Sequence, residues 1–86
     1  MARTSAAQKL GKRLKQLRHE ANLTQEKLSI ATGISQTYIS GIETGHRNPS
    51  IKTLDKIAKA LGVRLSDVTN FDDYRFRDRS RFSRHL

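Results

Sequence analysis

Short polar side chains and one glycine recur along one side of a short segment near the middle of the chain: Gln36, Thr37, Ser40, Gly41 and Thr44. A face of this composition has little use in a protein core. On a surface, its hydroxyl and carboxamide groups suit hydrogen bonding to base edges and phosphates, and the glycine suits a close approach. The chemistry that this pattern indicates is recognition of nucleic acid.

Two short helices that meet at a sharp corner must position this face, and the sequence predicts them over residues 25–32 and 36–44. Gly33 can adopt the positive φ that ends a helix, and Ser35 can cap the next helix by accepting its unpaired N–H groups. Ser29 is small where the two backbones come closest. The spacing of mostly apolar residues lets the helices share one seam, formed by Leu28, Thr32, Ile34, Ile39 and Ile42.

The length and charge of the chain are compatible with this interpretation. Its 86 residues are enough for one small domain and leave no room for a second core. The 17 Lys and Arg exceed the 8 Asp and Glu, which gives a net charge of +9. Residues 1–70 hold 12 of the basic and 5 of the acidic residues, so the folded part is itself basic. Solvated surfaces are also charged, but the excess suggests a polyanion such as nucleic acid as the partner.

Other functional classes find no support in the sequence. There is no cysteine, which excludes disulfides, cysteine-ligated zinc and a thiol nucleophile. The three histidines are isolated and no catalytic or phosphate-loop motif occurs, so we expect no enzyme, no metal site and no cofactor. No apolar run approaches the roughly 20 residues that span a bilayer, and the N-terminus lacks the apolar region of a secretory signal. We therefore expect a cytoplasmic protein that contacts no membrane.

Three further helices are expected around the corner, so the predicted fold is an all-α, compact five-helix bundle. The first covers residues 5–21, with Ser5 as its cap and leucines along one stripe. A loop with a proline follows the third helix, and Ser50 then caps a fourth. A fifth helix near residues 65–70 is so short that it needs packing against the others or a second subunit. The predicted buried stripe of the fourth helix is Ile51, Leu54, Ile57, Ala58 and Leu61.

The chain is expected to divide into a folded domain at residues 1–70 and a basic C-terminal tail at residues 71–86. In the tail, arginines alternate with aromatic, acidic and small residues. Three interpretations stay open. The tail could be a solvated terminus, a β-strand that pairs with its symmetry mate, or a basic arm that contacts DNA phosphate or a protein partner.

Residues 10–68 combine several distinctive pieces: Leu23-Thr24-Gln25, Gly33, Ser35, the run TYISGIETGHRNPSIKTL and the closing IAKALGV. Together they resemble the helix-turn-helix domain of the phage-repressor and Cro family, also called the XRE family. Within it, the run looks particularly like the small controller proteins of restriction-modification systems. One departure is Ser29, where the family usually carries alanine, but serine keeps the position small.

The resemblance implies that the third helix lies in the major groove, with its N-terminal residues against base edges. The residues at these positions are Gln36 and Thr37, and Ser40 faces the same way one turn further on. A glutamine can bond an adenine edge through N6 and N7, and a threonine offers a hydroxyl and a methyl group. Gly41 has no side chain, so we expect it to permit close approach.

Contacts to the DNA backbone are implied at other positions. Gln25 matches the first residue of the family's second helix, whose side chain and backbone N–H bind one phosphate. Arg47 is the strongest candidate after the reading helix, because its charge is not lost by titration. For Tyr38, the alternative is a half-buried ring that caps the core. The remaining candidates for backbone contacts are Ser35, His46, Asn48 and Lys52.

Arg18 and Glu43 match a family pair in which an arginine of the first helix holds a glutamate of the third. The implied role is structural, because the pair fixes the orientation of the reading helix. Ile30 faces outward from the seam, and two interpretations stay open: an isolated exposed apolar residue, or a contact for the tail or a partner. Lys56 and Lys59 are interpreted as a solvated face of the fourth helix.

Sequence and resemblance together predict a sequence-specific DNA-binding transcriptional regulator. We expect a repressor or autoregulator that acts as a homodimer on a palindromic operator in double-stranded DNA. Two alternatives stay open. One is an antitoxin-like or bridging module whose tail binds a protein partner, and the other is a protein that coats nucleic acid without sequence preference.

Overall fold

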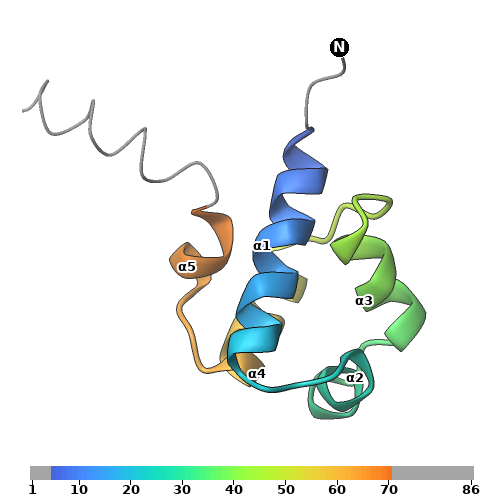
Figure 1. Ribbon diagram of the computed structural model, residues 1–86, viewed down its shortest axis with the longest axis vertical. Helices are drawn as coiled ribbons and strands as arrows, with labels where there is room; N and C mark the ends of the chain where they lie inside the picture. Colours follow the sequence, from blue (N-terminus) through green and yellow to red (C-terminus); the bar gives the residue numbers. More distant parts are fainter. Residues whose placement is uncertain (1–4, 71–86) are drawn as a thin grey trace, which may run out of the picture.

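A computed structural model describes residues 5–70 of the chain, and all of its regular structure in this range is helical (Figure 1). The helices of the described part are α1 (Ala6–Glu20), α2 (Gln25–Thr32), α3 (Gln36–Glu43), α4 (Ile51–Leu61) and α5 (Leu65–Thr69). The predicted all-α fold and the predicted helices are confirmed, with ends that differ by a residue or so. The predicted tail at residues 71–86 lies outside the described residues, so the division at residue 70 stays a prediction.

The first four helices begin at a side chain that accepts a backbone N–H. The hydroxyls of Ser5, Thr24, Ser35 and Ser50 each accept from the residue three positions further on. These hydrogen bonds satisfy N–H groups that have no partner inside the helix. Gly33, with a φ of 76°, ends α2 in the left-handed conformation and turns the chain toward α3. The corner therefore forms from the residues that predicted it.

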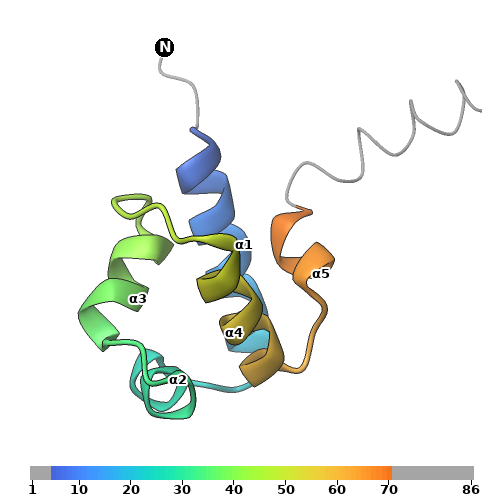
Figure 2. The ribbon, with the colours of Figure 1, turned by 180° about the vertical axis from the view of Figure 1, so that it is seen from behind.

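One apolar core holds the five helices in place. Helix α1 packs against α3 and α5, α2 packs against α3 and α4, and α4 packs against α5. In both ribbon views, α3 and α5 lie on opposite sides of α1 (Figures 1 and 2). Every helix contributes to the fully buried set of large side chains, which are Leu14, Leu28, Ile39, Ile42, Ile57 and Val68. Because burying one such side chain stabilises the fold by about 1.5–3 kcal/mol, the short helices depend on this shared core.

Helix α5 is tied to α1 by a side-chain hydrogen bond, and a second hydrogen bond caps its start. Arg13 of α1 donates from Nε to the backbone carbonyl of Asp67 at 2.8 Å. The Asp67 carboxylate accepts the backbone N–H of Arg64 at 2.9 Å, and this hydrogen bond lowers the pKa of Asp67 below its usual value of 3.8.

Within residues 5–70, no helix is long and apolar enough to cross a lipid bilayer.

The predicted buried stripe of α4 is wrong at its first position. Ile51 is 64% exposed, whereas the other four members of the stripe are buried. Helical periodicity gives the direction in which a side chain points, but it does not say whether a neighbouring helix extends far enough to cover it. Ile30 of α2, which the sequence places outside the seam, is 76% exposed as expected.

Candidate nucleic-acid interface

Helix α3 is divided into an apolar inner side and a polar outer side. Ile39 and Ile42 are fully buried, while Gln36 and Thr37 are exposed and Ser40 is partly exposed. The Ser35 hydroxyl accepts the N–H of Tyr38 at 3.1 Å, so its own O–H is left to donate to another group. The predicted reading face is thus presented to solvent from the first turn of the helix.

The three candidate base-reading residues share one surface depression with a residue of α2. Gln25, Gln36, Thr37 and Ser40 line this open depression, which has a volume of about 300 Å³. Gln25 is the first residue of α2 and Gln36 is the first residue of α3, so the corner brings the two helix starts to one place. The depression offers carboxamide and hydroxyl groups, which can bond both base edges and a neighbouring phosphate.

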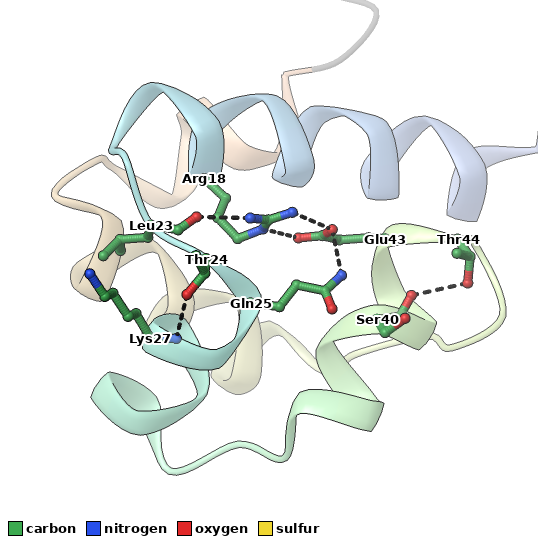
Figure 3. Close-up of polar contacts among 8 residues, drawn as sticks. All are labelled: Arg18, Leu23, Thr24, Gln25, Lys27, Ser40, Glu43 and Thr44. Carbon is green, nitrogen blue, oxygen red and sulfur yellow. Dashed lines mark hydrogen bonds and ion pairs between the residues drawn. The ribbon is translucent and has the colours of Figure 1, made fainter.

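A buried ion pair lies behind this face and joins α1 to the end of α3 (Figure 3). Arg18 donates from Nε and Nη2 to the two carboxylate oxygens of Glu43, at 2.6 and 3.1 Å. The two side chains are only 7% and 2% exposed. Arg18 also donates from Nη1 to the backbone carbonyl of Leu23 at 2.8 Å. This bidentate geometry fixes direction as well as distance, so it sets how α3 is oriented on α1.

Gln25 is part of the same buried network. Its Nε2 donates to Oε1 of Glu43 at 3.0 Å (Figure 3). A carboxamide nitrogen has two N–H donors, so one of them is left for a further acceptor such as phosphate. The sequence pointed to Gln25 as a DNA ligand but not to its bond with Glu43, because these residues are 18 positions apart and no local pattern connects them.

The side chain of Arg47, in the loop after α3, folds back over Gly41 and Tyr38 of that helix. Its guanidinium carbon is 5.8 Å from the centre of the Tyr38 ring, and a Cβ placed on Gly41 would come within 2.5 Å of Arg47 Cγ. The space beside Gly41 is therefore occupied by an arginine of the chain itself, and the close approach to DNA that the sequence suggests at Gly41 stays a prediction. Tyr38 is half-buried and packs against the core, in agreement with the alternative interpretation of its ring.

The other candidates for backbone contacts lie in the loop after α3 and at the start of α4. His46, Asn48 and Lys52 are all exposed. The Nδ1 atom of His46 lies 2.8 Å from the hydroxyl of Thr44, whose O–H also lies within 3.0 Å of the Ser40 carbonyl oxygen. For Asn48 and Lys52, the predicted role rests on polarity, charge and position.

Gly11 positions α3 from the α1 side, a role that no sequence pattern indicated. The residue is buried in α1, and a Cβ placed there would lie 2.5 Å from the backbone carbonyl oxygen of Glu43. Because this neighbour is backbone and cannot rotate away, the two helices can cross here only at a glycine. The available signal was a glycine in a helix interior, where alanine would be more favourable.

The polar groups at this face are neutral and cationic side chains. Among residues 5–70, no three histidine, aspartate or glutamate side chains are grouped as a metal ion would require. The groups that the fold brings together are neutral hydrogen-bonding side chains at the corner and cationic side chains around it. This combination is typical of binding to nucleic acid, where cations contact phosphates and neutral polar groups contact bases.

Comparisons with known proteins agree with the geometry. The sequence profile of the helix-turn-helix family HTH_3 matches residues 14–68. The control protein C.BamHI of Bacillus amyloliquefaciens is 44% identical over 62 residues, which cover 71% of this chain and 76% of that protein. The restriction-modification controller protein C.AhdI of Aeromonas hydrophila has a similar crystal structure, with a TM-score of 0.70 and 35% identity over 72% of this chain and 94% of that one.

A third similar protein has been solved with DNA. The structure of the restriction-modification controller protein C.Esp1396I, as a tetramer in complex with its natural 35-base-pair operator, has a TM-score of 0.65 to this chain. Its sequence identity is 39%, and the match covers 71% of this chain and 80% of that chain. The profile match includes the whole of α2, α3 and α4. The chain belongs to the HTH_3 helix-turn-helix family, of the XRE type, whose members are DNA-binding transcriptional regulators and not enzymes.

Proposed function

We propose that the chain is a controller-type repressor or autoregulator that binds a palindromic operator as a homodimer, with one α3 helix in the major groove of each half-site. The observation that carries this proposal is the depression lined by Gln25, Gln36, Thr37 and Ser40. The similarity to C.BamHI, C.AhdI and C.Esp1396I supports the controller type in particular.

Sequence is read in this proposal by the first turn of α3. The exposed carboxamide of Gln36 accepts from N6 and donates to N7 of one adenine, and each such bidentate pair discriminates against a wrong base by about 1–3 kcal/mol. Thr37 contacts a thymine methyl or a neighbouring acceptor. Ser40, one turn further along the same side, contacts the next base or its phosphate.

Position along the duplex is set by phosphate contacts on both sides of α3. The free N–H of Gln25 and the start of α2 bind one phosphate on one side. On the other side, Arg47 makes the main phosphate contact. The further phosphate contacts there come from Ser35, Tyr38, His46, Asn48 and Lys52. Because Arg18 and Glu43 already hold α3 in place, little ordering of the helix is left for the binding step.

Selection of DNA from a random pool, followed by titration, tests this function. Selection with this chain should enrich DNA that contains an inverted repeat with half-sites about 34 Å apart. Two chains should bind each such site. Fluorescence anisotropy at 150 mM salt should then give an affinity for the selected site about 10³-fold or more above that for a scrambled site. Equal affinity for both DNAs would instead support a coating protein, and absence of DNA binding would refute the proposal.

One truncation separates the three interpretations of the predicted tail. If removal of residues 72–86 leaves dimerisation and operator affinity unchanged, and no partner co-purifies with the full chain, the tail is a solvated terminus. Loss of dimerisation is expected for a paired strand, and loss of affinity with dimerisation intact is expected for a basic arm on DNA. For an arm that binds a protein partner, both properties would stay intact, while a stoichiometric partner would co-purify only with the full chain.

A further inference from the structure

We propose that Gly41 is a positioning residue for DNA binding. By lacking a side chain, it lets Arg47 lie across α3 and over Tyr38, so that the guanidinium is held beside the reading face before DNA arrives. This inference rests on the proposed function, because it assigns a role to Gly41 in that same interface.

The conformation of the backbone does not explain a glycine at this position. Gly41 lies inside α3, and its φ is not among the positive values found at Gly33, Gly45 and Gly62. In a helix interior, glycine is less favourable than alanine because it loses more conformational entropy on folding. Something other than local backbone geometry must therefore account for the missing side chain.

The space beside Gly41 is filled by the stem of Arg47. A Cβ built on Gly41 would lie 2.5 Å from Cγ, 3.4 Å from Nε and 3.5 Å from Cδ of this arginine. The loop that carries Arg47 is fixed at the same residue, since the backbone N–H groups of His46 and Arg47 donate to the carbonyl of Gly41 at 2.8 and 3.1 Å. Gly41 thus holds the loop by its backbone and makes room for the side chain.

Tyr38 supplies the surface on which the arginine ends. It lies three positions before Gly41, on the same side of the helix, and its ring packs against the core. The guanidinium carbon of Arg47 is 5.8 Å from the ring centre, within the range of a cation–π contact. The backbone of Arg47 is thus fixed by the Gly41 carbonyl, and its guanidinium lies over the Tyr38 ring one turn earlier in α3.

This arrangement reduces the cost of ordering a long side chain when DNA binds. An added methyl group at Gly41 would push the arginine stem away, but the neighbour that must move is a solvent-exposed side chain and not backbone. The fold should therefore tolerate alanine at this position, but the Arg47 guanidinium should lose its place over the Tyr38 ring.

A double-mutant cycle measures this coupling on the selected operator. Gly41→Ala should weaken binding about 2- to 10-fold, the range expected for losing the prior order of one long side chain. In an Arg47→Ala background, the same substitution should cause no further loss. The melting temperature of Gly41→Ala should equal or exceed that of the wild type, because alanine favours the helix. An unchanged affinity would overturn the proposal, and so would an equal loss in both backgrounds, since the methyl group would then meet the DNA itself.

Proton NMR of the free protein tests the placement without DNA. In the wild type, the Tyr38 ring should displace the Arg47 Hδ and Hε resonances upfield, and this displacement should disappear in Gly41→Ala. If the resonances are the same in both proteins, Gly41 does not position Arg47. A wild type that binds operator and scrambled DNA equally would overturn the proposed function, but the NMR difference between the wild type and Gly41→Ala would persist. Failure of the proposed function is therefore distinguishable from failure of this inference.

Discussion

Gln25, the first residue of α2, donates a hydrogen bond to Glu43, the last residue of α3, at 3.0 Å (Figure 3). The accepting oxygen is the one that also accepts from Nη2 of Arg18 in α1. One carboxylate therefore joins three helices at the point where the corner must keep its angle. Because the same glutamine lines the depression beside Gln36, the internal bracing and the proposed DNA-binding surface share a side chain.

Removing one member of the buried ion pair should cost more than removing both. Arg18→Met leaves the Glu43 carboxylate buried without its main partner, and we expect a loss of about 3–5 kcal/mol in the free energy of unfolding. The double variant Arg18→Met/Glu43→Leu should recover part of this loss. Urea denaturation of the two single variants and the double variant measures the coupling. Losses that simply add would show that the pair contributes no mutual stabilisation.

Gln25→Ala should lower both stability and DNA affinity. Stability should fall by about 0.5–1.5 kcal/mol through the lost bond to Glu43. Affinity should fall alike on operator and scrambled DNA, because a phosphate contact carries no sequence information. Gln16 is a matched control, since its exposed carboxamide on α1 also bonds a glutamate, Glu20, at 3.1 Å. If Gln16→Ala weakens DNA binding as much as Gln25→Ala, the assignment of Gln25 is wrong.

Gln36→Ala should change which sequence is preferred. We expect a loss of about 1–3 kcal/mol on the operator and a relaxed preference at one base pair of each half-site. Repeating the DNA selection with the variant measures this directly. A variant that still selects the wild-type sequence at every position would exclude Gln36 as the reading residue.

Arg47→Ala should weaken binding to all sequences by a similar factor. If Arg47 neutralises one phosphate, the slope of log affinity against log salt should become shallower by about 0.9 per chain. Lys56→Ala is the charge-matched control. Lys56 is exposed on α4, and its substitution removes the same charge from a surface for which no DNA contact is proposed. Equal slopes for the two variants would mean that the effect is one of net charge only.

Two helix-interior glycines, Gly11 in α1 and Gly41 in α3, should respond oppositely to alanine. Gly11→Ala places a methyl group against the backbone of Glu43 and should destabilise the fold by about 1–3 kcal/mol or more. Gly41→Ala meets only the Arg47 side chain and should leave the stability equal or higher. Thermal unfolding of both variants separates the cases. A stable Gly11→Ala protein would show that α1 and α3 can move apart without cost.

The sequence alone determined the helices, the caps at Ser5, Ser35 and Ser50, the left-handed turn at Gly33 and the polar outer face of α3. These features depend on helical periodicity and on the conformational preferences of single residues, which act over a few positions of the chain. The ion pair between Arg18 and Glu43 was implied by the family resemblance, and its bidentate geometry came from the structure.

Only the tertiary structure decided how distant segments meet. The bond from Gln25 to Glu43, the crossing of α1 at Gly11 and the path of Arg47 over Gly41 depend on how helices pack, which local periodicity does not encode. The exposure of Ile51 has the same origin, because burial requires a neighbour as well as a direction. The sequence thus determined which residues lie on the outer face of α3, and the packing of α1 and α2 against α3 determined how firmly, and at what angle, that face is held.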